Sequence, residues 1–192
     1  MKYLDLRKKI THNLFTFLDV VKLFPSEDPQ LIKTQLSRFS QKKLITKIKR
    51  ELYCFDPALI DEFVLANKLY QPSYISLETA LNGYGIIPDI PQSFTSVTTT
   101  TTKKINNQFG SFRYIKIKQS LFFGFSSVQS SRAPIYYNLA LKEKALLDYL
   151  YVRKLQNITD LRLNLSEINY TIYHKFARTF PPWVQKIITS KI

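Results

Sequence analysis

The residues of this sequence best suited to chemistry are cations gathered between positions 31 and 50. Seven lysine or arginine residues fall in this segment, with no aspartate or glutamate among them. Cations at such density attract the phosphates of nucleic acids through a long-range field that salt screens. The segment therefore favours a nucleic-acid contact, and the alternative is an ordinary solvated basic surface.

The spacing of apolar residues indicates which elements would carry these cations. Ile32, Leu36 and Phe39 recur at the period of a helix, which leaves the polar residues on its other side. Residues 44–55 then alternate, turn and return, which predicts a short basic hairpin. A helix followed by such a hairpin is typical of a winged helix-turn-helix, whose helix enters the major groove while the wing contacts the DNA backbone.

Ten side chains are the candidate DNA contacts. Those on the helix would lie nearest the groove, and those on the hairpin would contact phosphate. They are Lys33, Gln35, Ser37, Arg38, Gln41, Lys42, Lys43, Lys47, Lys49 and Arg50.

Two helices are expected before the basic one. Residues 3–11 predict a short helix, and the apolar residues within 15–24 predict a second. Ser26 or Asp28 would then cap the basic helix, with Pro29 in its first turn, where a missing N–H costs nothing. Helix, helix, basic helix and hairpin is the order of a winged domain.

The sequence predicts an α+β protein with two domains. A winged helix-turn-helix is expected over residues 1–57, and a linking helix capped by Asp56 over 58–71. Residues 72–192 would form a mixed α/β domain with C-terminal helices.

The expected elements of the second domain come from local periodicity. They are a helix through Ile75–Leu81 with Ser73 as its cap, a threonine-rich strand at 94–102, a strand at 109–118, strands at 121–125 and 135–137, a helix at 139–155, and two or three helices in the last forty residues, interrupted at Pro181-Pro182. Their predicted core is Ile75, Leu77, Leu81, Val97, Phe112, Tyr114, Leu121, Phe123, Leu146 and Leu150.

The charge of the whole chain is +14, and its excess is uneven. Residues 90–142 contain seven lysine or arginine residues and no carboxylate. Charge alone leaves three roles open for this region: a groove for RNA or DNA, a dock for an acidic protein, or a solvated surface. The candidate residues for a partner surface are Lys103, Lys104, Arg113, Lys116 and Lys118. On an ideal strand Arg113 points away from Lys116 and Lys118, so these three side chains would meet only if the strand had a bulge or an edge twist.

The residues that metal or thiol chemistry needs are sparse. His12 and His174 lie far apart, each without a neighbouring cysteine or histidine, and Cys54 is alone. Metal-ligand spacing is therefore absent, and no cofactor or metal is expected.

The carboxylates are also poorly placed for catalysis. Gly110-Ser111 resembles the start of a nucleotidyltransferase motif, but no carboxylate follows before Glu143, so two-metal chemistry has no ligands. Glu143 and Asp148 lie five apart on a predicted helix and would point in different directions, which favours a salt-bridge or capping role for each. We expect a binding protein rather than an enzyme.

The sequence also bears on location. No run approaches the roughly 18–20 apolar residues that span a bilayer, and the first fifteen residues lack the apolar stretch of a signal peptide. With a lone cysteine, nothing suggests export. We expect a cytoplasmic protein without a membrane partner.

Several motifs occur in an order that resembles the AbiEi family, the antitoxins and transcriptional regulators of type IV toxin–antitoxin and abortive-infection systems. The motifs span roughly residues 72–152 and follow the basic N-terminal domain. They are residues 72–81, 84–88, 95–99, 109–114, 121–124 and 142–151.

The resemblance implies a protein with two roles. The winged domain would bind duplex DNA at inverted repeats in its own promoter and repress the operon. The remainder would counter a nucleotidyltransferase-like toxin, with or without a stable complex. The part after Tyr151 is shorter than this resemblance leads one to expect, which keeps open a regulator that has lost antitoxicity. A second alternative is an RNA-binding or toxin-docking module that uses residues 90–142. The oligomeric state is left open.

Overall fold

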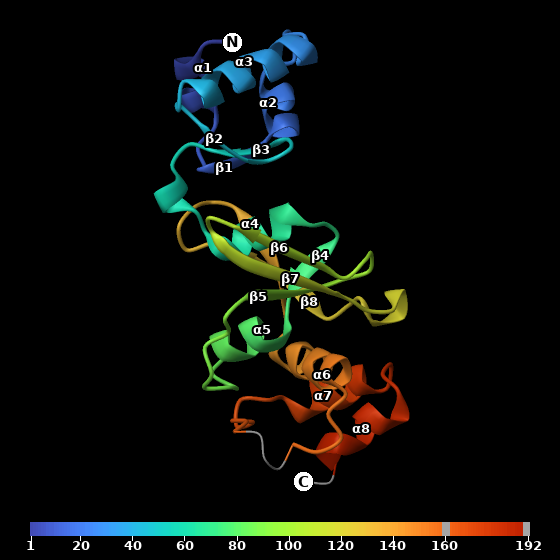
Figure 1. Cartoon of the computed structure of the whole chain (residues 1–192). Coiled ribbons are helices and arrows are strands. Elements are labelled where there is room, and N and C mark those ends of the chain that lie inside the picture. The colour runs from blue at the N-terminus through green and yellow to red at the C-terminus, as the bar shows by residue number, and fades with distance from the viewer. Residues whose placement is uncertain (159–161, 190–192) are drawn as a thin grey trace. The chain divides into compact units, whose positions relative to one another are not determined.

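A computed structural model describes residues 1–158 and 162–189 (Figure 1). The chain divides into two compact units, which are described separately. Unit 1 contains Met1–Leu69 and Gln129–Ile135, and unit 2 contains Tyr70–Val128 and Tyr136–Ile192. Helices and strands are mixed in the chain, so the predicted α+β class is confirmed.

Unit 1 begins with helices that cover a small sheet. Its elements are α1 (Tyr3–Lys9), β1 (Leu14–Thr16), α2 (Phe17–Leu23), α3 (Pro29–Gln41), β2 (Thr46–Lys49), β3 (Leu52–Cys54), the 3-10 turn η1 (Pro57–Leu59) and α4 (Glu62–Leu69). The three strands form an antiparallel sheet in the order β1-β3-β2.

The start of α2 corrects the helix expected over residues 15–24. Phe15 lies in β1 with its side chain fully buried, and the helix begins only at Phe17. Thr16 caps it, because its hydroxyl accepts from the backbone N–H of Asp19 while the Asp19 carboxylate accepts from the N–H of Thr16. This capping box was not recognised in the sequence.

The helix expected after the hairpin is divided in two. Asp56 accepts a hydrogen bond from the N–H of Ala58, but it caps η1 and not a long helix. The side chain of Asp61 then accepts from the N–H groups of Phe63 and Val64, at 2.9 and 3.2 Å, and α4 follows. Two consecutive caps therefore produce a short turn and a separate helix.

Unit 2 is built on a six-stranded mixed sheet with the order β6-β7-β5-β4-β9-β8. Its elements are β4 (Ser73–Ile75), α5 (Leu77–Gly83), β5 (Phe94–Thr98), β6 (Lys103–Asn107), β7 (Gly110–Lys116), the 3-10 turn η2 (Gln119–Leu121), β8 (Phe125–Gln129), β9 (Tyr136–Ala140), α6 (Lys142–Arg153), α7 (Tyr170–Ala177) and α8 (Pro182–Thr189).

Several predicted boundaries in unit 2 are wrong because strand pairing overrides local pattern. Ser73 is no helix cap, since it lies in β4 opposite Thr98. The threonine-rich strand ends at Thr98 rather than 102, and β6 follows where no strand was expected. Leu121 ends a 3-10 turn instead of starting a strand.

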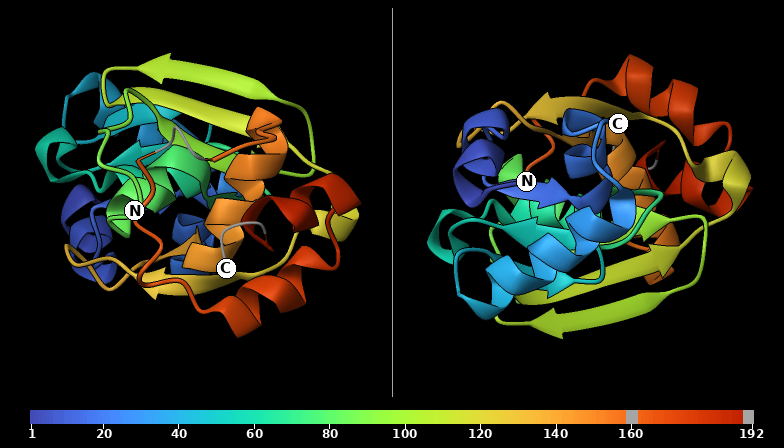
Figure 2. Two further views of the ribbon diagram at one scale, coloured as in Figure 1. Left: turned by 90° about the horizontal axis from the view of Figure 1, so that it is seen from below. Right: turned by 90° about the horizontal axis from the view of Figure 1, so that it is seen from above.

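The predicted core of unit 2 is largely confirmed. Of its ten residues, only Phe123 is half-buried, while the other nine are buried. Helices α5 and α6 pack against each other, and α6 also contacts α7 and α8, as the orange and red ribbons show (Figure 2). Among the described residues, no helix is long and apolar enough to cross a bilayer.

Candidate nucleic-acid interface

Helix α3 is fixed to unit 1 by one apolar side. Its N-terminus is capped by Asp28, whose carboxylate accepts from the N–H of Gln30 at 2.8 Å, and Pro29 is its first residue. Ile32, Leu36 and Phe39 are buried in the core of the unit. The opposite side of α3 therefore faces solvent.

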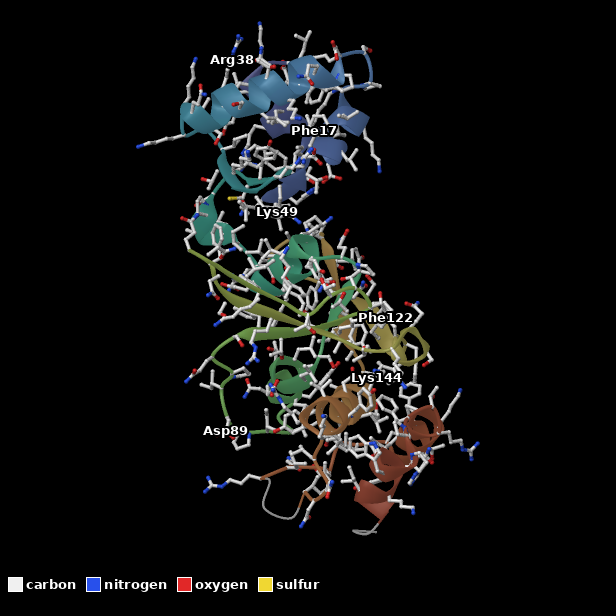
Figure 3. The ribbon with its side chains drawn as sticks, turned by 45° about the vertical axis from the view of Figure 1, so that its right-hand side comes forward. Phe17, Arg38, Lys49, Asp89, Phe122 and Lys144 are labelled. Carbon is white, nitrogen blue, oxygen red and sulfur yellow. The ribbon has the colours of Figure 1, made fainter. Side chains whose placement is uncertain are left out.

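Most of the predicted DNA contacts on this helix are exposed. Arg38 extends from the outer side of α3 (Figure 3). Gln35 is only half-buried, because it lies at the border of the apolar side. The exposed residues of α3 and of the turn after it are Lys33, Ser37, Arg38, Gln41, Lys42 and Lys43.

A lysine in a left-handed conformation ends α3. Lys43 has a φ of 57°, a region where glycine is favoured. Around it the N–H of Leu44 donates to the carbonyl of Phe39 at 2.9 Å, and the N–H of Lys43 donates to that of Ser40 at 3.0 Å. These two bonds satisfy the carbonyls of Phe39 and Ser40 in the last turn of the helix. Lys42 and Lys43 are exposed where the chain leaves it.

The hairpin carries the second part of the candidate interface. Strand β2 pairs with β3 through Lys47 opposite Tyr53 and Lys49 opposite Leu52, so one extra residue lies between the two lysines. The turn that follows contains Arg50, which is exposed and lies 3.6 Å from the carboxylate of Glu51.

One predicted contact has another partner within unit 1. The ammonium of Lys49 donates to the backbone carbonyl of Leu69, the last residue of α4, at 2.8 Å. A cation held in this way stabilises the fold of unit 1, and its contact with a phosphate stays a prediction. Lys47 and Lys49 are both exposed.

Two cations of α1 also have partners within unit 1. The guanidinium of Arg7 lies 4.3 Å from the ring centroid of Phe55, and the ammonium of Lys9 donates to the carbonyl of Leu23 at 2.8 Å. By contrast, Lys33, Arg38 and Lys42 make no ion pair within residues 1–158 and 162–189. The outer side of α3 therefore carries several exposed cations without an ion pair.

The thiol of unit 1 is unsuited to chemistry. Cys54 is fully buried in β3. Burial, together with the charge of Asp56, raises the pKa of its thiol to about 11, against a weaker effect of the hydrogen bond with Thr46. The described residues also contain no group of three histidine, cysteine or carboxylate side chains that could hold a metal ion.

The second candidate surface lies in unit 2, where the register of the strands places its cations on different sides of the sheet. Lys104 lies opposite Arg113 across the β6–β7 pair, while Lys103 lies opposite Tyr114. Side chains alternate along β7, so Lys116 shares the side of Tyr114 and not that of Arg113. The pairing of β7 with β5 and β6 runs without a shift, and Lys118 lies beyond the strand. The five cations therefore do not meet on one surface.

The neighbours of these cations differ as well. Lys103 lies with its ammonium 5.2 Å from the ring centroid of Tyr70. Arg113 lines a recess of about 170 Å³ together with Glu78 and Arg153. In that recess Glu78 is already paired, since it accepts from Nε of Arg153 at 2.7 Å.

A buried ion pair in unit 2 was missed in the sequence. Lys144 and Asp148, one turn apart on α6, contact each other with both side chains fully inaccessible to solvent. The Asp148 carboxylate also accepts from the hydroxyls of Tyr74 at 2.9 Å and Ser76 at 2.8 Å, and the Lys144 ammonium donates to Tyr74 at 2.8 Å. Figure 3 labels Lys144 within this unit.

Burial governs the titration of this pair. It raises the pKa of the Asp148 carboxyl, while the charge of Lys144 and the hydroxyl hydrogen bonds act in the opposite direction. It lowers the pKa of the Lys144 ammonium, against the attraction of Asp148. The i, i+4 spacing of a lysine and an aspartate was the available sequence signal. The salt-bridge role expected for Asp148 is observed, and Glu143 accepts from the N–H of Asn169 at 2.9 Å.

Comparison with known proteins adds no identification. The chain matches no protein-family model and no curated protein.

Proposed function

We propose that this protein is a DNA-binding transcriptional autorepressor and antitoxin of a type IV toxin–antitoxin system. Its N-terminal unit would act as a winged helix-turn-helix on duplex DNA, at inverted repeats in its own promoter. Its toxin would be a nucleotidyltransferase-like protein. The protein would act in the cytoplasm as a binding protein and not as an enzyme.

The observation that carries the DNA-binding part is the outer side of α3. It presents cations that are exposed, unaccompanied by carboxylates on the same helix and without an ion pair in the described chain. A helix held by Ile32, Leu36 and Phe39 is rigid enough to place these side chains in a major groove. The hairpin next to it offers Lys47 and Arg50 to the backbone. The order of helices and strands in unit 1 supports the proposal of a winged helix-turn-helix.

The antitoxin part rests on a different observation. It depends on the ordered motifs of residues 72–152 and their resemblance to AbiEi proteins. The alternative of a regulator without antitoxicity shares the same DNA-binding unit. An RNA-binding or toxin-docking module at residues 90–142 is less well supported, because strand register separates its candidate cations.

Mobility shifts of the full chain on its upstream region test the repressor. We expect that DNA to be retarded at protein concentrations that leave random duplex free, with the preference lost in Arg38→Ala. Equal binding of both duplexes would contradict a specific repressor.

Co-expression with the product of the adjacent gene tests the antitoxin. Rescue should survive in variants that have lost DNA binding. Charge reversal at Lys103, Lys104 and Lys116 should abolish rescue and leave repression intact if those residues form the antitoxin surface. Unchanged rescue would assign them to a solvated surface.

A further inference from the structure

We propose that unit 2 has a second binding site, a pocket for a nucleoside 5′-phosphate between the end of β7, the C-terminus of α6 and the start of α8. The site is separate from the proposed DNA contacts, and it was not predicted from the sequence.

The pocket is a cavity of about 540 Å³, which falls in the range of roughly 300–1,000 Å³ typical of small-molecule sites. It joins residues that are distant in sequence. Among those that line it are Ile115, Lys116, Tyr151, Lys154, Gln156 and Trp183.

One wall of the cavity is aromatic and held in place. The rings of Tyr151 and Trp183 are stacked, with centroids 6.1 Å apart and planes 20° from parallel. Phe180 contacts the edge of this arrangement, 5.7 Å from Tyr151. Trp183 nevertheless remains 38% exposed, so its ring offers a flat surface to a planar ligand such as a nucleobase.

The polar groups of the cavity fit the remaining parts of a nucleotide. Lys116 and Lys154 are exposed and make no ion pair within the described residues, so both are available to a phosphate. Gln156 brings an amide, which can both donate to and accept from the edge of a base. The described residues that line the cavity include no aspartate or glutamate to repel an anion.

The backbone at Lys154 adds to this assignment. Lys154 has a φ of 52°, at the end of α6, where glycine would be less strained. As the end of a helix, a lysine in this conformation is less stable than a glycine. Its charge lies beside the cavity, where a phosphate would use it.

Trp183 is the only tryptophan of the chain, so its fluorescence reports on the pocket directly. With ATP as the probe and the full chain as the protein, we expect saturable quenching at up to millimolar nucleotide. Calorimetry should give the same affinity. No quenching and no heat would overturn the proposal.

Variants test which groups bind. Lys154→Gly removes a charge and relieves backbone strain, so the variant should fold and lose affinity by about tenfold. The matched control is Lys118→Gln, which removes an equal charge from an exposed residue outside the cavity lining. Trp183→Leu should bind ATP about tenfold more weakly, because the base no longer has a ring to stack on; calorimetry measures this affinity. Equal losses for Lys118→Gln and Lys154→Gly would reduce the effect to general charge attraction and overturn the site.

Other ligands separate the proposed class from its competitors. Adenosine and inorganic triphosphate should each bind more weakly than ATP, since each offers only half of the contacts. Triphosphate binding as well as ATP would show a simple anion site. A single-stranded oligonucleotide that binds more tightly as its length increases would identify a strand-binding surface instead. Either result would contradict the proposal, and neither depends on the outcome of the promoter experiments.

Discussion

Helices α3 of unit 1 and α6 of unit 2 are similar in length and end in the same way, but they use their cations differently. Each helix is followed by a lysine in the left-handed region, Lys43 after α3 and Lys154 after α6. In both cases the next residue donates its N–H to the carbonyl five positions earlier. Along α3 the cations are exposed and unpaired, whereas Lys144 of α6 is buried against Asp148.

The difference between the two helices shows that the role of a lysine depends on whether its ammonium is solvated or buried. A solvated ammonium is free to meet a polyanion and contributes little to folding. A buried one is costly to desolvate and requires a carboxylate beside it. The exposed cations are therefore candidates for binding, and the buried one for positioning α6 against β4.

The largest effect should come from breaking the buried pair. Asp148→Ala leaves the ammonium of Lys144 without its carboxylate, so we expect a loss of about 3–5 kcal/mol in the unfolding free energy of unit 2. Urea titration followed by Trp183 fluorescence measures it.

The double variant Lys144→Met with Asp148→Leu is the control. Because it removes both charges, it should recover part of the stability, while the buried hydroxyls of Tyr74 and Ser76 still lack their acceptor. The reaction of Cys54, buried in unit 1, with a thiol reagent follows the unfolding of that unit separately. An Asp148→Ala protein with unchanged stability would show that the pair is unimportant.

The exposed side of α3 should govern base recognition. Arg38→Ala is expected to reduce the binding free energy for the upstream DNA by about 1–3 kcal/mol at the base pairs it reads, with little change on random duplex. Fluorescence anisotropy with base-substituted duplexes measures this. Lys22→Ala, a change at a cation on α2, serves as the control. A loss that is equal for every sequence would restrict Arg38 to phosphate contact.

Substitutions of the two lysines of β2 should have different effects on DNA binding and stability. Lys47→Gln is expected to flatten the dependence of log affinity on log salt by about 0.9, the value for one lost phosphate contact. Lys49→Gln should leave that slope nearly unchanged and lower the stability of unit 1, because Lys49 donates to the carbonyl of Leu69. Reversed results would identify Lys49, and not Lys47, as the phosphate contact.

The smallest effect concerns pH in unit 1. Burial lowers the pKa of His12 from its ordinary 6.5, Lys68 adds to this, and Asp19 opposes it. Below pH 6.5 the unfolded chain takes up a proton before the folded chain does. The contribution of His12 to the unfolding free energy is therefore fully present above that pH. It declines as the pH falls toward the lowered pKa. Comparing the urea midpoint of His12→Gln with that of the unaltered protein between pH 7 and about pH 5 tests this. The decline should be shallower in the variant, and an equal decline would exclude His12 as its source.

The sequence by itself determined those features whose cause is local. The start of α3 with Pro29 in its first turn, the apolar side of that helix and the basic hairpin depend on residues within a few positions of one another, so periodicity and capping chemistry suffice. The choice of Asp28 over Ser26 as the cap came from the structure. Nine of the ten core positions predicted for unit 2 are buried, because they recur at the period of a single strand or helix.

Only the tertiary structure decided the rest. Ser73 became a strand residue because it pairs with Thr98, and Lys49 was drawn to Leu69, twenty residues away. Tyr151 and Trp183 form one wall because α6 and α8 pack together. Such contacts depend on which distant residues share a surface after folding, and the local pattern of a sequence carries no record of that choice.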